Sequence, residues 1–436
     1  MSRPKIVCIV PAKGTSERIA GKNVAVLDGE YLFRRKIEQA LACPLIDAVY
    51  LDTEDDKLAA LADDLPVRRL GRPADLATNA TDGHALFAWE CAQVPDADIC
   101  IQALCTAPFV DADTLTRAIE ALLASDNDSL VAVHRASQYR WQDGEPTYGR
   151  GRIPNSVELP PSIVEAMSLY IVRRGEGSIE RRFGERPILF DLDAAEQLEV
   201  NVPADFALAE QVAAGRRAQE NGRLRAMRCF LSSPVLADIA KEMGLAAVLP
   251  PALRPTSPGK VLGRAKTLAI AALNGDRSGN AWKGIYGALD SYRFVRDGDV
   301  IMVANEAPER AYFGDLNATL AIRAGAQGVV VDGVTRDTTD VRALGLPVYA
   351  RGAYCDDIKY EGTLASIGKP IEIGGVAIRN GDYVFADDDG VVIIPAAHWP
   401  AVAGEAWKVM ENEARIRMMA ARGRAVGDIL SDCGAF

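Results

Sequence analysis

The chain has 436 residues, of which 49% are hydrophobic and 25% are charged, and its formal net charge is −11. This length exceeds one ordinary core and predicts two or three domains. The balance of hydrophobic and charged residues is typical of soluble globular proteins. The acidic charge argues against general nucleic-acid binding, so an anionic ligand needs a local positive site or a metal.

Cysteine and histidine patterns argue against several kinds of site. The eight cysteines include no CxxC pair and no zinc-like spacing, which predicts buried, reduced thiols in a cytoplasmic protein. His84, His134 and His398 form no cluster, so neither a zinc site nor a histidine-based mechanism is expected. The chain shows no secretory signal and no apolar run of about 18 residues, so we expect no membrane contact.

Strands and helices alternate in the first half of the chain. Short apolar runs predict strands, and apolar residues at helical spacing predict helices. We expect strands over residues 6–10, 47–53, 97–104, 129–135 and 165–174. We expect helices over residues 32–43, 55–65, 111–125 and 203–220. This alternation predicts an α/β sandwich with a mainly parallel sheet.

A second pattern follows the charged helix, and we place a linker at 223–229 between domains at 1–222 and 230–436. We expect helices over residues 231–244, 279–292 and 396–422. We expect strands over residues 263–273, 299–305, 325–333 and 347–352, and a hairpin over 381–395. The acidic turn of that hairpin, Asp387 to Asp389, resembles a metal site in composition but fits an ordinary turn better.

The first strand ends in a loop suited to phosphate groups. Gly14, Thr15 and Ser16 have small side chains and backbone N–H groups that can hold phosphate oxygens. Positive charge surrounds them, from Lys13, Arg18 and Lys22. A triphosphate needs such neutralisation before another anion attacks its α-phosphorus. An ordinary surface turn is the alternative, because short motifs carry little information.

Five segments resemble the CMP-sialic acid and CMP-ulosonate synthetases, in the same order, over residues 1–215. They are PAKGTSERIAGKN, GRPADLATNATDG, CTAPF, NSVELPPSIVEAMSLYIV and EVNVPADFALAE. The resemblance implies a nucleotidyltransferase fold that takes CTP, a sugar acid and Mg²⁺ or Mn²⁺. It assigns catalysis to Arg18 and Lys22, and nucleotide binding to Pro11, Ala12, Lys13, Gly14, Ser16, Asn23 and Arg72. It assigns substrate contacts to Gln102 and Glu158, and metal binding to Glu199.

The departures from this family concentrate at the sugar-acid and metal end. Lys13 replaces an arginine and cannot make a bidentate fork. The paired metal-binding aspartates fall on Glu199 and Asn201, and a neutral amide is the weaker ligand. Other departures are Leu104, Val157 and Glu158. Either the acceptor is unusual or the chemistry of this half is weakened, and we favour the unusual acceptor.

In the second half, the segment GDLNATLAIRAGAQGVVVDGVTRD combines a helix start with a strand end. Gly314 opens a loop before a helix whose first N–H groups, at Leu316 and Asn317, suit a small carboxylate. After a buried strand come Arg336 and Asp337. A carboxylate there can hold a divalent metal, and an arginine can stabilise an enolate oxygen. A structural ion pair between these two side chains is the alternative.

Residues 230–430 resemble the family that contains the class II pyruvate aldolases for 4-hydroxy-4-methyl-2-oxoglutarate and the RraA-type regulators of ribonuclease E. The matching segments are LADIAKEMG, GRAKTL, GDVIMV, GDLNA, VVVDGVTRD, PVYARG and GDYVFADDDGVVIIP. The resemblance implies an RraA-like α/β domain in which Asp337 is a metal ligand and Arg336 binds the keto or enolate oxygen. It implies that Asp315 holds a metal-bound water, and that the N–H groups of Leu316 and Asn317 take the pyruvate carboxylate.

The same resemblance implies a homo-oligomer, a trimer or a multiple of one, with an acid contributed by a neighbouring subunit. Glu411 and Glu413 are both candidates for that acid. Together the two halves predict a bifunctional enzyme, in which a metal-dependent pyruvate lyase handles 4-hydroxy-2-oxo acids and a cytidylyltransferase activates a 2-keto-3-deoxy sugar acid. The alternative is that one or both halves are non-catalytic, with the second half an oligomerisation or regulatory module.

Overall fold

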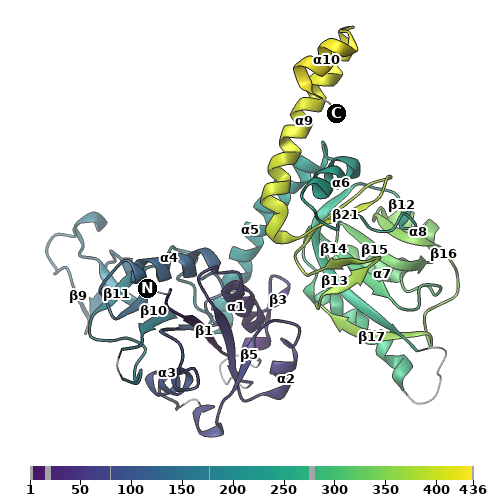
Figure 1. The fold of residues 1–436 in the computed structure, drawn as a ribbon. Coiled ribbons are helices and arrows are strands. Elements are labelled where there is room, and N and C mark those ends of the chain that lie inside the picture. Colours follow the sequence, from purple (N-terminus) through teal and green to yellow (C-terminus); the bar gives the residue numbers. More distant parts are fainter. Residues whose placement is uncertain (1–2, 15–20, 79, 176, 274–279, 435–436) are drawn as a thin grey trace. The chain divides into compact units, whose positions relative to one another are not determined.

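The computed structural model describes residues 3–14, 21–78, 80–175, 177–273 and 280–434. The chain forms two compact units, Met1–Ala213 and Ala214–Phe436 (Figure 1). The division falls inside helix α5 (Pro203–Arg228), so the linker predicted at 223–229 is helical instead. The helix continues through this segment because the apolar side chains of Leu224 and Met227 are buried in the core of the second unit. The second unit therefore begins earlier than residue 230.

The first unit is built on a seven-stranded sheet in the order β11-β7-β10-β6-β1-β4-β5. Strand β1 pairs in parallel with β4 and β6, and β10 is antiparallel to both of its neighbours. The mainly parallel sheet is thus confirmed. The strands are β1 (Ile6–Pro11), β4 (Ala48–Thr53), β5 (Arg68–Gly71), β6 (Ile99–Ala103), β7 (Ser129–Ala136), β10 (Ser162–Arg173) and β11 (Pro187–Asp191).

Helices cover both faces of this sheet. Helices α1 and α4 contribute to the core on one face, and α3 contributes to the core on the other. Aspartates begin three of these helices, because Asp55, Asp82 and Asp111 accept hydrogen bonds from the first N–H groups. The helices are α1 (Leu32–Leu41), α2 (Asp56–Ala60), α3 (Gly83–Ala92) and α4 (Ala112–Leu123). Short elements are η1 (Lys22–Val24), β2 (Val26–Leu27), β3 (Glu30–Tyr31), η2 (Ala74–Leu76), β8 (Trp141–Gln142), β9 (Glu145–Pro146) and η3 (Ser156–Glu158).

The second unit is built on an eight-stranded sheet in the order β12-β16-β15-β14-β13-β20-β21, with β17 also paired to β13. Strands β13 to β16 run parallel, so the carboxyl ends of β14 and β15 lie at one edge. The strands are β12 (Arg254–Ser257), β13 (Val261–Ala272), β14 (Asp299–Asn305), β15 (Gly328–Thr335), β16 (Val348–Ala353), β17 (Gly362–Ile367), β18 (Ile371–Ile373), β19 (Val376–Ile378), β20 (Tyr383–Ala386) and β21 (Val391–Ile394).

Two layers of helices pack on this second sheet. Elements α7, α8 and η4 lie over one apolar core, and α5, α6 and α9 contribute to another. In Figure 1 the yellow helix α9 extends away from the sheet and α10 lies beside its end, where the Asn412 amide donates to the carbonyl of Cys433 at 3.0 Å. The helices are α6 (Ser233–Glu242), η4 (Ala281–Phe294), α7 (Asp315–Ala324), α8 (Thr338–Leu344), η5 (Ala396–His398), α9 (Trp399–Ala421) and α10 (Val426–Cys433).

The acidic hairpin turn has a structural role. The Asp387 carboxylate accepts hydrogen bonds from the backbone N–H of Ser233 at 2.9 Å and from its hydroxyl at 2.6 Å. It thereby satisfies N–H and hydroxyl groups at the start of helix α6. The N–H of Asp389 also donates to it, at 3.1 Å. These bonds agree with an ordinary turn rather than a metal site.

All eight cysteines are free thiols. Five of them are buried in the first unit, as predicted, but Cys229 and Cys355 are exposed. The two exposed thiols lie at a helix end and in a loop, where the apolar pattern of the core strands has ended. Among the described residues, no helix combines the length and the apolar character that crossing a membrane requires.

Candidate functional sites

The predicted phosphate loop leaves the sheet at the carboxyl end of β1. Ala12 is anchored there, because its N–H donates to the carbonyl of Asp52 at 2.9 Å. A side chain at Gly14 would collide with the Asp55 carboxylate, which explains the glycine. The Gly14 N–H donates to Oε1 of Glu54 at 2.8 Å, so it is occupied by a carboxylate and not open as predicted. Thr15, Ser16 and Arg18 lie outside the described residues.

Several of the predicted nucleotide residues meet beside this loop. The Asn23 amide donates to the carbonyl of Lys13 at 2.8 Å, and the Cys105 thiol contacts Oδ1 of Asn23 at 3.2 Å. The Lys22 ammonium donates to the carbonyl of Val200 at 3.1 Å. These bonds bring the loop, the turn after β6 and the segment before α5 into one site.

The segment before α5 carries the two residues that replace the metal-binding aspartates. Glu199 and Asn201 flank Val200, whose own N–H donates to the carbonyl of Thr106 at 2.7 Å. The N–H of Asn201 donates to the carboxylate of Asp205 at 2.8 Å. Lys22 is therefore bonded to the residue next to Glu199, and the metal role implied for Glu199 stays a prediction.

A buried lysine supports the turn after β6, and no sequence pattern predicted it. Lys36 on α1 is fully buried and donates to the carbonyl of Val110. Burial lowers the pKa of Lys36 to about 7. Gln39, on the same helix, donates to the carbonyl of Pro108 at 2.8 Å. Burial also raises the pKa of Cys105, at the start of the turn, to about 11.

Arg72 and Gln102 are both buried in a charged network, and the nucleotide and substrate roles implied for them stay predictions. Arg72 Nε lies 3.0 Å from each carboxylate oxygen of Asp52. The Gln102 amide donates to Glu90 at 2.5 Å. Burial, followed by the neighbouring Asp52, raises the pKa of Glu90 well above its usual range. In this structure the two side chains offset buried carboxylates and do not face an open rim.

Glu158 lies on an exposed segment of the first unit. Its carboxylate accepts a hydrogen bond from Arg152 at 2.8 Å. The adjoining residues line a cavity of about 380 Å³ that includes Arg140, Trp141 and Tyr148. The pairing of Glu158 is thus local, and the role predicted for it stays a prediction.

In the second unit, two elements bring the predicted residues together. Strand β15 ends at Thr335, and the Arg336 N–H donates to the carbonyl of Phe313 at 2.9 Å, just before α7 begins. A side chain at Gly314 would collide with Oδ2 of Asp337, so this carboxylate lies directly against the start of α7. Asp337 has φ 54°, a left-handed conformation that aspartate tolerates better than most residues.

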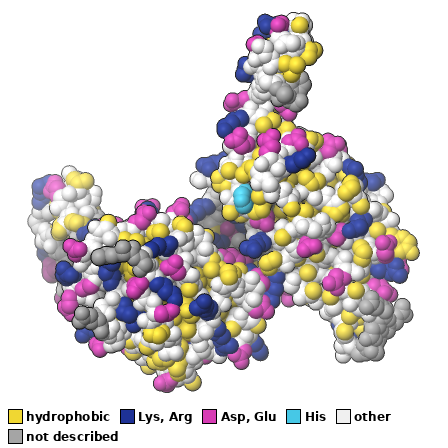
Figure 2. Space-filling model, viewed as in Figure 1, with side chains coloured by type: hydrophobic (Ala, Val, Ile, Leu, Met, Phe, Trp, Pro, Cys, Tyr) yellow, Lys and Arg dark blue, Asp and Glu magenta, His cyan; other side chains and the backbone are white. Residues whose placement is uncertain are grey.

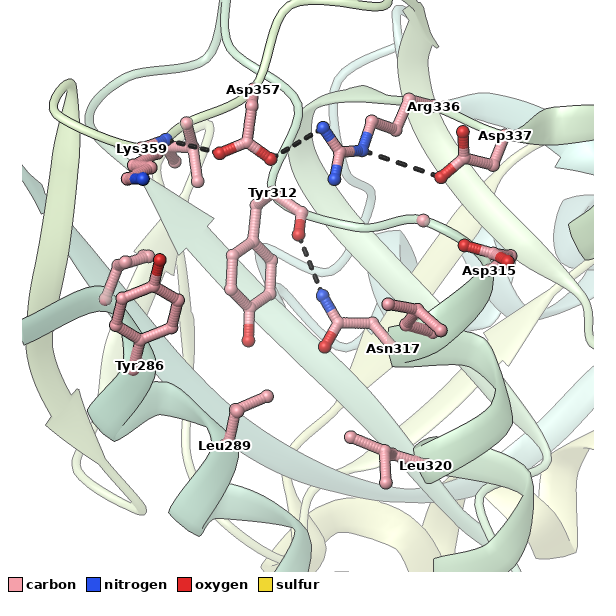
Figure 3. Close-up of a pocket in the computed structure, with 14 residues that line it drawn as sticks. Tyr286, Leu289, Tyr312, Asp315, Asn317, Leu320, Arg336, Asp337, Asp357 and Lys359 are labelled. Carbon is pink, nitrogen blue, oxygen red and sulfur yellow. Dashed lines mark hydrogen bonds and ion pairs between the residues drawn. The ribbon is translucent and has the colours of Figure 1, made fainter. Parts of the chain in front are cut away.

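These residues border a cavity of about 270 Å³ (Figure 3). Its polar end holds the Asp315 and Asp337 carboxylates and the Arg336 guanidinium, and its other end is largely apolar and aromatic. The lining residues are Ile285, Tyr286, Leu289, Tyr312, Gly314, Asp315, Leu316, Asn317, Leu320, Arg336, Asp337, Asp357, Ile358 and Lys359. Asp315, Leu316, Asn317, Arg336 and Asp337 thus all line this one cavity, and the roles implied for them stay predictions.

Arg336 has two acidic partners, one of which the sequence did not reveal. Its Nε is 3.5 Å from Asp337 Oδ2, and its Nη1 is 2.7 Å from Asp357 Oδ2. The closer partner is Asp357, in the loop after β16. The adjacent arginine and aspartate do form an ion pair, as the structural alternative proposed, but both also line the cavity.

Asn317 is fixed by its side chain. Its amide donates to the carbonyl of Tyr312 at 2.9 Å and accepts from the Tyr292 hydroxyl at 3.1 Å. Burial raises the pKa of both tyrosines, so they stay protonated at neutral pH. The start of α7 is therefore held rigidly. Leu316 is 75% exposed and lines the cavity.

The donor atoms of this cavity suit some metal ions and not others. Within the described ranges, no group of three His, Cys, Asp or Glu side chains is arranged to hold a metal. Figure 3 shows Asp315 and Asp337 at the same end of the cavity. Mg²⁺ commonly binds through one or two carboxylates and keeps several waters, whereas zinc requires more protein ligands. The residues thus fit a largely hydrated magnesium ion.

Charges of both signs are interspersed on the face of the molecule that Figure 2 shows. On α9, Glu413 pairs with Arg417 at 2.5 Å. The assignment of Glu411 or Glu413 to a neighbouring subunit's site stays a prediction.

Comparisons with known proteins support both halves. A family model described as Cytidylyltransferase matches residues 7–145, and one described as Aldolase/RraA matches residues 233–393. A putative 4-hydroxy-4-methyl-2-oxoglutarate aldolase of Halalkalibacterium halodurans is 35% identical over 170 residues, 39% of this chain and 73% of that protein. Protein DlpA of Legionella pneumophila is 31% identical over 182 residues, 41% of this chain but only 29% of DlpA. The chain thus spans less than a third of DlpA's length.

Two solved structures are similar to one half each. Streptomyces coelicolor RraAS2, an unusual member of the RNase ES inhibitor RraA family, is 28% identical with a TM-score of 0.39, covering 45% of this chain and 95% of that one. CMP:2-keto-3-deoxy-manno-octonic acid synthetase complexed with CTP is 17% identical with a TM-score of 0.36, covering 50% and 99%. On the family models and the aldolase relative, the chain belongs to the Aldolase/RraA family through its second half and carries a cytidylyltransferase domain in its first half.

Proposed function

We propose that the chain is a bifunctional enzyme. Its first unit transfers CMP from CTP to a sugar acid, and its second unit cleaves or forms a 4-hydroxy-2-oxo acid. The observation that carries the second activity is the cavity where Arg336, Asp337 and the start of α7 converge. A carboxylate, an arginine and open helix N–H groups are the groups that pyruvate enolate chemistry needs.

In the lyase direction, the N–H groups of Leu316 and Asn317 bind the substrate carboxylate, and Arg336 faces the 2-oxo oxygen. The C4 hydroxyl gives its proton to solvent water, the C3–C4 bond breaks, and an aldehyde or ketone leaves. The electron pair moves to the enolate oxygen, which Arg336 stabilises, and protonation at C3 gives pyruvate. Bound Mg²⁺ or Mn²⁺, held by Asp337, would supply Lewis-acid polarisation of the same oxygen.

In the first unit, the hydroxyl of the acceptor attacks the α-phosphorus of CTP. The bond to the β-phosphate oxygen breaks, pyrophosphate leaves, and the hydroxyl proton passes to solvent. Lys13 and Lys22 stand beside the loop and offset the charge of the phosphates. Glu199 is the proposed ligand of the magnesium that accompanies the nucleotide, and Asn201 in place of a second aspartate implies a non-standard acceptor.

The two proposed reactions can follow one another. Aldol addition of pyruvate to an aldehyde gives a 4-hydroxy-2-oxo acid, and ulosonic acids carry that same head. The second unit can therefore supply the kind of acid that the first unit activates.

A panel of 2-keto-3-deoxy acids tests the transferase. With CTP and Mg²⁺ present, at least one acid is expected to give release of pyrophosphate from CTP, and the absence of release across a broad panel would remove the transferase from the proposal.

The lyase test is Asp337→Ala, which is expected to abolish pyruvate formation from a 4-hydroxy-2-oxo acid. Retained pyruvate formation would overturn the metal assignment.

A second candidate is that the first unit does not catalyse. Two observations favour it: the Gly14 N–H is bonded to the Glu54 carboxylate, and Asn201 stands where a carboxylate is expected. Titration calorimetry of CTP into the protein with Mg²⁺ present separates the candidates, because a transferase must bind CTP.

We further propose a homo-oligomer, in which helix α9 of a neighbouring subunit completes the second site. Light scattering coupled to size exclusion measures that state, and a monomer would contradict it.

A further inference from the structure

The Arg336 guanidinium lies between two carboxylates that come from different segments. Its Nη1 is 2.7 Å from Asp357 Oδ2, and its Nε is 3.5 Å from Asp337 Oδ2. Figure 3 shows the remaining terminal nitrogen, Nη2, directed into the cavity between Tyr312 and Asp315. The two carboxylates thus fix the plane of the guanidinium and leave one amino group to meet a ligand.

Asp357 is itself held in place. Its second oxygen, Oδ1, accepts a hydrogen bond from the backbone N–H of Lys359 at 2.7 Å. Its segment pairs with Ala311, because the N–H of Ile358 donates to the Ala311 carbonyl at 3.1 Å. Tyr360 follows in a left-handed conformation, with φ 73°. A non-glycine residue keeps such a conformation only where its surroundings fix it. The carboxylate therefore has a defined position against Arg336.

We propose that Asp357 is a positioning residue of the second site, an inference that rests on the proposed lyase function. Its carboxylate holds Arg336 so that Nη2 faces the enolate oxygen. It also keeps the guanidinium from turning fully onto Asp337. An unrestrained arginine pairs with an adjacent carboxylate through both of its arms. That pairing would take Nη2 out of the cavity and occupy the Asp337 oxygens.

The test uses the full chain with two substitutions. Asp357→Ala removes the carboxylate, and Asp357→Asn keeps an oxygen that can accept from Nη1. Exchange of the pyruvate methyl protons in D₂O, followed by NMR with Mg²⁺ present, reports enolate formation without an acceptor aldehyde. Asp357→Ala is expected to lower kcat for exchange by about 100-fold with little change in KM, the scale of a misplaced catalytic group. Asp357→Asn is expected to recover most of that loss.

The chain offers a matched control in Asp356. This neighbouring aspartate pairs with Arg310 at 3.4 Å and does not line the cavity. Asp356→Ala makes the same charge change one residue away and is expected to leave exchange unchanged. Thermal unfolding of each variant checks that the fold persists. If Asp357→Ala matches wild type, or if Asp356→Ala lowers kcat as much, the positioning role is wrong.

A binding measurement separates this inference from the proposed function. Oxalate mimics the pyruvate enolate, and its affinity can be measured by calorimetry with Mg²⁺. Wild-type protein that neither binds oxalate nor exchanges protons would contradict the lyase proposal itself. Oxalate binding by wild type that is weakened in Asp357→Ala but not in Asp356→Ala supports the positioning role. Equal oxalate affinity in wild type and Asp357→Ala overturns the positioning role alone.

Discussion

At the scale of single residues, burial distinguishes a side chain that can meet a ligand from one that cannot: Arg336 lines a cavity, whereas Gln102 is fully buried. The family resemblance of residues 230–430 assigned Asp315 and Asp337 to one site, and both side chains line one cavity. Asp357 had no such signal, since it lies in a loop after β16 without periodicity. The resemblance assigned a substrate contact to Gln102, whose amide is turned toward the buried Glu90 in the structure. Strand position predicts a residue's neighbourhood, and the burial of its partners decides its role.

Lys36 carries a prediction about pH. The pKa of Lys36 is about 7 in the folded protein, whereas an unperturbed lysine has a pKa of 10.5. Between these two pH values the unfolded chain therefore binds one more proton than the folded protein. Stability therefore rises with pH across that window, by up to about 1.4 kcal/mol per pH unit, and the dependence from this group vanishes below about pH 7. The raised pKa of Glu90 acts in the opposite direction, so only a difference between variants isolates Lys36.

The measurement is urea unfolding of residues 1–213 at pH 7 and pH 9. Lys36→Met should lose the rise in stability with pH that wild type shows. The difference in the free energy of unfolding between Lys36→Met and wild type should narrow as the pH increases. Lys57→Met, at an exposed position on α2, is the control and should keep the wild-type slope. A slope difference equal for both variants would contradict the assignment to Lys36.

At the scale of elements, the strands were predicted better than the connections. The apolar composition of buried runs such as β1, β14 and β15 predicts that they are strands. Helix α3 was missed because its apolar residues do not gather on one stripe. The linker was misplaced because NGRLRAMRC carries several polar and charged residues, yet Leu224 and Met227 are a helical turn apart and both are buried.

Helix α5 supplies the test of this boundary. Its second part is tied to the second unit by ion pairs from Arg217 to Asp299 at 2.7 Å and from Arg264 to Glu220 at 2.7 Å. A fragment of residues 214–436 should fold cooperatively. A fragment of residues 230–436 leaves the buried Asp299 carboxylate without Arg217 and should be less stable by about 3–5 kcal/mol. Urea unfolding compares the two, and equal stability would restore the predicted boundary at 230.

At the scale of the whole molecule, the two compact units each contain the residues of their own site. The residues around Lys22 all belong to the first unit, and the cavity around Asp337 belongs to the second. Fold class and the two family resemblances followed from ordered segments, because many weak matches in one order restrict a fold more than any single motif. The acceptor did not follow, since it depends on a few side chains whose partners lie far away in sequence.

Separate sites predict separable losses. Lys22→Ala removes a charge beside the phosphate loop and should lower CTP-dependent pyrophosphate release by about 100-fold or more, while pyruvate formation stays within about twofold. Asp337→Ala should lower pyruvate formation and leave pyrophosphate release nearly unchanged, because the Asp337 carboxylate lines the cavity of the second unit. Both products are measured on the same preparations, with Lys57→Ala and Asp356→Ala as surface controls. If either site variant suppressed both reactions while both controls remained active, the two units would have to act as one catalytic system, and independent sites would be wrong.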